Sequence, residues 1–89
     1  MGIDVSKSIV FSPHALQKMI DRGTTEAEVE ATIHEGNQEP ARKGRVMFRK
    51  NFAFGSQWRG KRFAVKQVAP VVAEEANRLV VVTVFIYYF

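Results

Sequence analysis

The 89-residue sequence contains no cysteine. This absence excludes a disulfide scaffold, a catalytic thiol and thiolate ligands for a metal. It fits a reducing compartment, and we expect a cytoplasmic protein. The two histidines, His14 and His34, lie far apart with no carboxylate at ligand spacing, so we expect no metal site and no cofactor. The length allows one domain, residues 1–89, with a single core.

The sequence also lacks a segment suited to a membrane. The first seven residues show no basic region followed by an apolar run, so we expect no signal peptide. The longest apolar run, residues 79–89, is shorter than the roughly 20 residues that a membrane-spanning helix needs. With 46% hydrophobic and 25% charged residues, the composition is that of a globular protein. We therefore expect no membrane contact and interpret the final run as a buried strand.

Carboxylates are missing from residues 42–66, which carry nine positive charges. Residues 1–40 have a net charge of −4, so the overall +4 hides a strongly polarised chain. A field of this sign and density attracts polyanions, and nucleic acid is the commonest of them. The alternative is a solvated surface that serves only solubility. The basic run coincides with aromatic residues, including Trp58, that can stack on bases while the cations hold phosphates.

Two helices are predicted in the first half of the chain. Ser12 and Pro13 form a good helix start, and Gly23 ends a helix over residues 13–22 with Leu16, Met19 and Ile20 on its buried face. A capping box, Thr25 to Glu28, starts a second helix that presents Val29 and Ile33 to the core and stops at Gly36. Together they predict a helical hairpin over residues 11–36, followed by a polar loop over residues 37–44.

After Gly44 the apolar period changes from 3.6 to 2, which indicates strands. The first strand turns its apolar residues from Val46 to Phe54 inward, and residues 55–60 are turn-like. The second strand is expected to face inward with Phe63, Val65, Ala69 and Val71, to face outward with Arg62 and Lys66, and to lie at an edge or bend at Pro70. The final strand, residues 79–88, is apolar enough to be covered on both faces. The prediction is an α+β domain with helices on one face of three antiparallel strands over residues 45–89.

His14 is the residue best placed for chemistry. It falls at the second position of the first helix, with Lys18 and Arg22 following at spacings of four on one flank. The positive end of the helix dipole disfavours an imidazolium, and a neutral imidazole beside cations is what a ribonuclease needs to take a proton from a 2′-hydroxyl. The alternative is a hydrogen-bonded structural histidine. Thr83, the polar residue inside an apolar strand, is either β-branched filler or a hydroxyl that contacts a phosphate or orients a base.

The residues from Phe11 to Gly36, with His14-Ala15, Met19 and Arg22-Gly23, and the Val80–Phe85 strand resemble a bacterial and phage family, domain of unknown function 4258. That family resembles the RelE, ParE and BrnT toxins, within the wider group of small metal-independent ribonucleases. The resemblance implies a helical hairpin on a curved antiparallel sheet of three to four strands, and places His14, Arg22 and Thr83 in the site. Lys18 stands where the family usually has arginine, so a bidentate phosphate contact passes to Arg22.

The leading hypothesis is therefore a ribonuclease-like toxin domain that binds RNA, with DNA as the alternative polyanion, and pairs with an antitoxin or immunity protein. His14 acts as base or acid, Arg22 and Lys66 stabilise the phosphorane charge, and Thr83 positions a phosphate oxygen or His14. The predicted nucleic-acid contacts are Lys18, Arg45, Arg49, Lys50, Trp58, Arg59, Lys61 and Arg62. Two alternatives remain open: a non-catalytic nucleic-acid-binding domain, and a protein-interaction module or homodimer through the apolar final strand.

Overall fold

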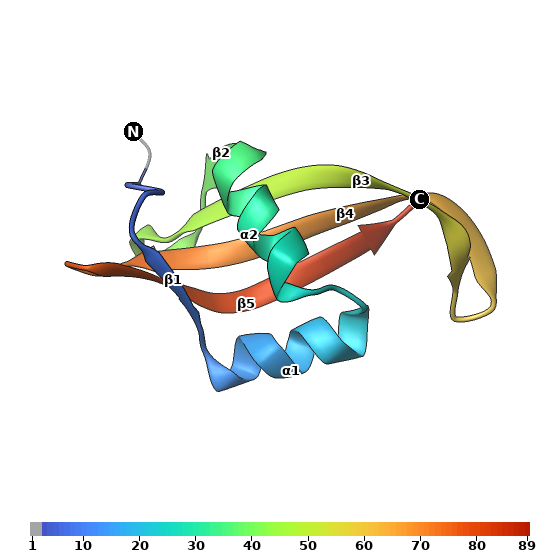
Figure 1. Cartoon of the computed structure of the whole chain (residues 1–89), viewed down its shortest axis with the longest axis horizontal. Coiled ribbons are helices and arrows are strands. Elements are labelled where there is room, and N and C mark those ends of the chain that lie inside the picture. Colours follow the sequence, from blue (N-terminus) through green and yellow to red (C-terminus); the bar gives the residue numbers. More distant parts are fainter. Residues whose placement is uncertain (1–2) are drawn as a thin grey trace.

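The computed structural model describes residues 3–89, and in that part of the chain two α-helices accompany one five-stranded sheet (Figure 1). Met1 and Gly2, which open the segment where we expect no signal peptide, lie outside the described residues. The elements, in chain order, are β1 (Ser8–Phe11), α1 (Pro13–Arg22), α2 (Glu26–Glu35), β2 (Asn37–Pro40), the 3₁₀ turn η1 (Arg42–Gly44), β3 (Val46–Trp58), β4 (Lys61–Glu74) and β5 (Arg78–Tyr88).

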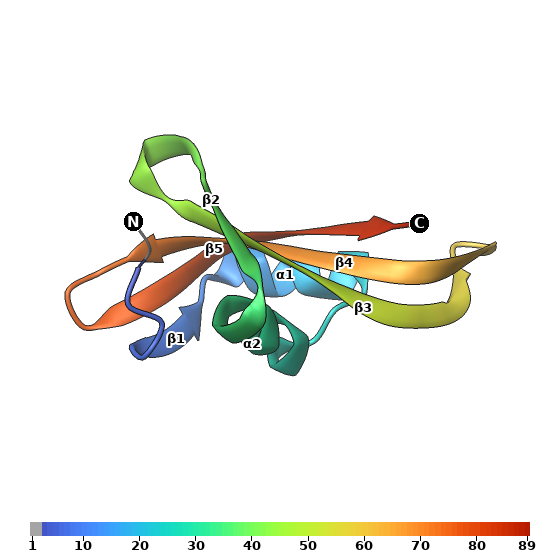
Figure 2. The same cartoon turned by 90° about the horizontal axis from the view of Figure 1, so that it is seen from above.

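The strand order is β1-β5-β4-β3-β2, with β1 parallel to β5 and every other pair antiparallel. The fold is α+β, but the predicted helical hairpin on three to four antiparallel strands is wrong. A strand precedes the helices, and β2 with η1 occupies the predicted loop of residues 37–44. The helices also pack separately: α2 crosses one face of the sheet, whereas α1 lies along β5 (Figures 1 and 2).

The ends of α1 follow from its capping residues, as predicted. The Ser12 side chain accepts a hydrogen bond from the Ala15 backbone N–H, and Gly23 terminates the helix in the left-handed conformation. The predicted buried face is only partly right, because Met19 is buried but Ile20 is 75% exposed. Since α1 flanks the sheet instead of covering it, only a narrow stripe through Ala15 and Met19 reaches the core.

The capping box of α2 is present as predicted, with Thr25 and Glu28 each accepting a hydrogen bond from the other's backbone. Val29 and Ile33 are buried against β3 and β4, where they join Phe48, Val68 and Val72 in the core. This packing makes the face of the sheet under α2 the covered face.

The long β3–β4 hairpin turns later than predicted. Residues Arg59 and Gly60 form the turn, both with positive φ as the tight hairpin turns require, so Ser56 to Trp58 still belong to β3. Gly55, also at positive φ, lies in a register shift that lets the strand continue. Pro70 lies in an interior strand rather than at an edge, and a second register shift follows it at Val71/Val72.

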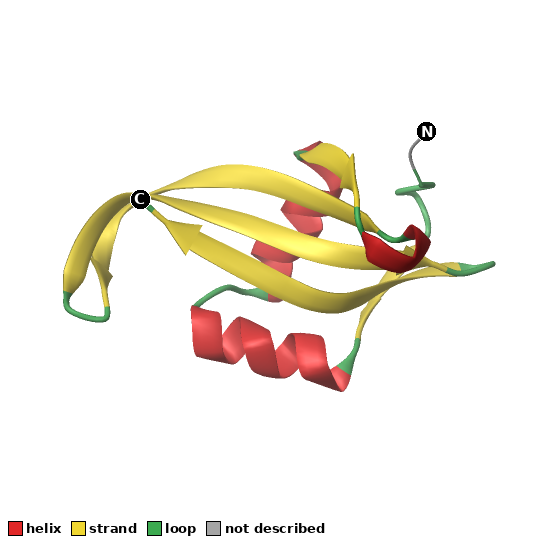
Figure 3. Cartoon of the chain, turned by 180° about the vertical axis from the view of Figure 1, so that it is seen from behind, coloured by secondary structure: helices red, strands yellow, loops and turns green. Residues whose placement is uncertain are grey.

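Opposite α2 the sheet has an open face, seen toward the viewer in Figure 3 with η1 in front of it. The side chains that alternate away from the core define it: Met47, Arg49 and Asn51 on β3, Gln67, Ala69 and Val71 on β4, and Thr83, Phe85 and Tyr87 on β5. Tyr87 is 43% exposed. The prediction that the final strand is covered on both faces is therefore wrong beyond its first half.

Candidate functional site

The start of α1 is fastened to β5, and this places His14 against Thr83. The Ser12 backbone N–H donates to the Val81 carbonyl at 3.0 Å, and the Ser12 hydroxyl donates to the Val82 carbonyl at 3.2 Å. Two residues later, the exposed His14 brings Nε2 to 3.1 Å from Thr83 Oγ1. The Ser12 cap of α1 thus brings together two side chains, His14 and Thr83, that lie 69 residues apart in the sequence. In residues 3–89, no hydrogen bond occupies the other ring nitrogen, Nδ1.

Arg22, at the other end of α1, reaches the same strand. Its Nη1 donates to the Val84 carbonyl at 2.8 Å, and its guanidinium carbon lies 5.2 Å from the centre of the Phe85 ring. The Tyr88 hydroxyl donates to the Arg22 carbonyl at 2.7 Å and holds this helix end in place. His14 and Arg22 are eight residues apart, about 12 Å along the helix. The structure therefore pairs His14 with Thr83 and places Arg22 farther along the same edge of β5.

Arg49 occupies the middle of the open face. Its Nε and Nη2 donate to Oε1 of Glu39 at 3.2 and 3.0 Å, and its Nη1 donates to Oε1 of Gln67 at 2.9 Å. The guanidinium carbon lies 5.6 Å from the centre of the Tyr87 ring. The hydrogen bonds that Arg49 donates to Glu39 raise the pKa of Arg49 further, so this side chain carries its charge at every relevant pH. A fixed cation thus sits beside an exposed aromatic ring.

Between η1 and the open face lies a pocket of about 400 Å³. Its apolar lining includes Met47, Val71 and Phe85 from three adjacent strands, and its charged lining includes Glu39, Arg42 and Arg45. Figure 2 shows the β2–η1 segment rising on the side of the sheet opposite α2, where it forms one wall. Phe85 faces both this pocket and Arg22, so the pocket adjoins the β5 edge.

Lys66 is not on this surface, and the prediction that it faces outward is wrong. It is only 7% exposed, on the covered face, where Nζ lies 2.8 Å from Oε1 of Glu28 and 3.0 Å from the Gly23 carbonyl. Burial raises the pKa of Glu28, but hydrogen bonds from Lys66 and Thr24 and the Lys66 charge outweigh burial and leave the pKa lowered. The charge of Lys66 is thereby neutralised inside the fold, away from His14.

The other predicted cations are spread over three places. Lys50 pairs with Glu35 at 3.3 Å on the helix side, and Lys18 lies on α1 between His14 and Arg22. At the far end, the Trp58 ring stacks on Tyr88 with centroids 5.0 Å apart, and the Arg59 guanidinium lies over Trp58. Arg59 and Trp58 share a hollow of about 250 Å³ with Arg22, whereas Lys61 and Arg62 are exposed at the hairpin turn.

Sequence reasoning missed the pocket and three of the side chains that shape the open face: Glu39, Gln67 and Phe85. One available signal was the spacing of two between Thr83, Phe85 and Tyr87, which places all three on one face of a strand. Nothing local indicated Glu39, because its strand contains no β-forming residue.

These observations define a class of protein. It is a small α+β domain whose open sheet face carries an arginine and apolar residues, with a histidine–threonine pair at the edge of the sheet. A family model described as a domain of unknown function (DUF4258) matches residues 11–86, and the chain belongs to this family. The match includes His14, Arg22 and Thr83. No curated protein and no solved structure matches the chain. None of the helices in residues 3–89 is long and apolar enough to cross a membrane.

Proposed function

We propose that this protein is a metal-independent, ribonuclease-like domain of a toxin–antitoxin type system that binds RNA on its open face. The observation that carries the proposal is the 3.1 Å contact between His14 Nε2 and Thr83 Oγ1 at the exposed edge of β5. It couples the proton-transfer group best suited to neutral pH with a hydroxyl that fixes the orientation of its ring. The resemblance of the family's motifs to RelE, ParE and BrnT toxins supports the same class.

The chemistry begins with the tautomer of His14. When Nε2–H donates to Thr83 Oγ1, the lone pair of Nδ1 is free to accept the proton of a ribose 2′-hydroxyl. The 2′-oxygen then bonds to the neighbouring phosphorus, the bond from phosphorus to the 5′-oxygen breaks, and the leaving oxygen takes a proton from water or from the protonated His14. The products are a 2′,3′-cyclic phosphate and a 5′-hydroxyl.

Arg22 supplies positive charge close to this reaction. Its Nη1 is held by the Val84 carbonyl, so the guanidinium stays beside β5 with its remaining N–H groups available to a phosphate. A preorganised donor of this kind stabilises charge as it develops on the phosphorane. Arg49 and Arg45 lie farther along the surface and hold neighbouring phosphates without reading sequence.

The partner of such a domain would be an acidic or helical antitoxin that covers the basic surface. Within residues 3–89, Arg42 and Arg45 have no carboxylate partner, so their charge is available to an acidic protein as well as to RNA.

The test is incubation of the purified protein with a mixed RNA ladder in EDTA. We expect His14→Ala to lower cleavage by about 10² to 10⁴, the usual contribution of general acid–base catalysis. Thr83→Val keeps the β-branched shape and should lower cleavage by less, because it removes only the group that orients the ring. His34→Ala is the matched control, since His34 is exposed on α2 and should cleave like the wild type.

If wild type and His14→Ala both leave RNA intact while binding it in a salt-sensitive way, the catalytic proposal is wrong. The domain would then be a non-catalytic nucleic-acid-binding module. Equal cleavage by wild type and His14→Ala would mean that His14 takes no part in the reaction, and the mechanism above would be wrong.

A further inference from the structure

We infer that the pocket between η1 and the open face binds one unpaired nucleobase of the RNA, and that Glu39 selects a base with an exocyclic amino group. This inference takes RNA as the ligand from the proposed function, but it requires binding only and no step of cleavage. The pocket has a volume of about 400 Å³, which lies within the range of small-ligand pockets.

The position of the pocket relative to His14 supports a base neighbouring the scissile phosphate. Thr83 is paired with Val71, and Val71 is paired with Met47. Since neighbouring strands lie about 4.8 Å apart, Met47 is about 10 Å from the residue that His14 contacts. The row Thr83–Val71–Met47 thus leads from the proposed reacting group directly into the pocket.

The lining suits a base flanked by phosphates. Phe85 offers an aromatic ring and Met47 an adaptable apolar side chain, both of which pack on the face of any base. Arg42 and Arg45 line the same pocket, and neither is engaged by a carboxylate within residues 3–89. A nucleotide fits this lining because its base fills the apolar part while its flanking phosphates meet the two cations.

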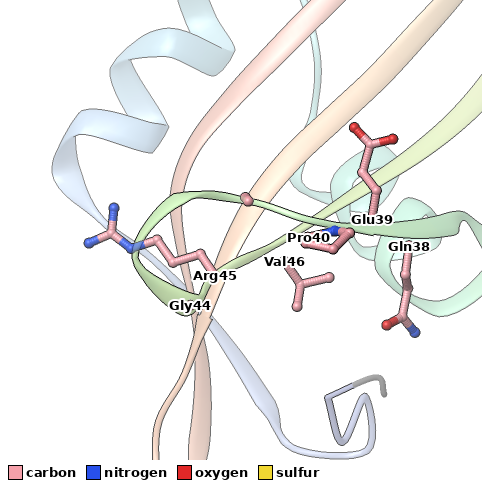
Figure 4. A pocket seen from close by; sticks show the side chains of 7 residues that line it. Gln38, Glu39, Pro40, Gly44, Arg45 and Val46 are labelled. Carbon is pink, nitrogen blue, oxygen red and sulfur yellow. The ribbon is translucent and has the colours of Figure 1, made fainter.

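Glu39 supplies the selectivity. Both hydrogen bonds from Arg49 go to Oε1, and among residues 3–89 no donor reaches Oε2. The Glu39 side chain is 47% exposed. Figure 4 draws the neighbouring hollow, which is lined by Gln38, Gly44 and Val46 as well as Glu39, and shows that the Glu39 carboxylate points to the opposite side of β2 from Gln38. A free carboxylate oxygen accepts from the amino group of cytosine, whereas uracil presents an acceptor at the same position.

The test uses anisotropy of labelled hexamers of cytidine and of uridine, two pyrimidines of equal size that differ at the exocyclic group. The protein carries His14→Ala, so cleavage does not interfere. We expect the cytidine hexamer to bind about tenfold more tightly, the value of one hydrogen bond to a charged group. Glu39→Gln should bring the ratio close to one, because its amide also donates to uracil. Glu30→Gln removes the same charge on the opposite face and should leave the ratio at about ten.

A second variant tests occupancy of the pocket directly. Ala41 lines the pocket, and Ala41→Trp should fill it and weaken cytidine binding about tenfold while circular dichroism shows an intact fold.

Equal affinity for the two hexamers, or a ratio unmoved by Glu39→Gln, would overturn the inference. RNA affinity insensitive to Ala41→Trp would do the same and leave the pocket to a protein partner. A wild type that does not cleave RNA, with the cytidine preference intact, would refute the catalytic proposal and leave this inference standing.

Discussion

The two faces of the sheet use the same residue types for different purposes. On the covered face, Lys66 and Lys50 each form an ion pair with a glutamate of α2, and these pairs hold the helix to the sheet. On the open face, Arg49 is fixed by Glu39 and Gln67 yet remains beside an exposed tyrosine ring. A basic run in a sequence therefore does not translate into one basic surface, because strand alternation divides it between two environments.

Among the variants that test this difference between the two faces, we expect the loss of Lys66 to change stability most. Lys66→Ala leaves Glu28, with a side chain 27% exposed, without its cation, and we expect about 2 kcal/mol less free energy of unfolding in urea titrations. Arg49→Ala removes an exposed pair and should cost less than about 1 kcal/mol.

Replacing both members of the buried pair sharpens the result. The double variant Lys66→Met/Glu28→Gln should recover part of the lost stability, because no buried charge remains and glutamine keeps the capping box. Equal losses for Lys66→Ala and Arg49→Ala would mean that the two faces do not differ in this way.

A smaller effect concerns acid. The pKa of Glu28 is lowered in the fold, so the ionised form favours the folded state, and its contribution is complete above the unfolded value near 4.5. As pH falls through the folded pKa, this contribution disappears and stability decreases. Glu28→Gln should flatten the dependence of unfolding free energy on pH below about 4.5.

Part of the acid dependence should survive that substitution. The pKa of Glu74 is also lowered, by its hydrogen bond with Lys7. The variant Glu74→Gln, made at an exposed position, should therefore change the slope less than Glu28→Gln. An unchanged slope in Glu28→Gln would show that the Lys66 pair does not respond to protonation.

The smallest effect is the salt dependence of RNA binding. Arg45→Gln should reduce the slope of log affinity against log salt by about 0.7, the value for one phosphate contact on a single strand. Lys50→Gln changes the net charge equally, but Lys50 is held by Glu35 on the helix side, so its slope should match that of the wild type. Identical slopes for the two variants would mean that RNA does not distinguish the faces.

The helices were predictable because their signals are local. Ser12 and Gly23 bound α1, and Thr25 with Glu28 begins α2, whatever the rest of the chain does. Strand β1 contains the strand-forming residues Ile9, Val10 and Phe11, but it is only four residues long and so shows little of a period. Strand β2 was missed because only its partner makes it a strand. The residues of β2, Asn-Gln-Glu-Pro, have poor strand propensity, yet they pair with β3 over their whole length.

The orientation of β4 was unpredictable for a related reason. Val71 and Val72 are adjacent and both apolar, so alternation does not choose which of them faces the core. The structure puts Val72 in the core, and Lys66 follows onto that face because Glu28 of α2 is there to pair with it. The contact between His14 and Thr83 depends on the same kind of long-range placement, and local patterns suggested each residue without joining them.

The position of α1 beside β5 also keeps this strand from pairing with strands of other molecules. In residues 3–89 the outer edge of β5 has no neighbouring strand beyond Val81, and the segment from Leu79 to Tyr88 has the apolar, β-branched composition that recruits further strands. Arg22 caps the Val84 carbonyl on that edge, and Ser12 engages those of Val81 and Val82. A helix thus stands where a sixth strand from another copy would otherwise add, and loosening it exposes a template for aggregation.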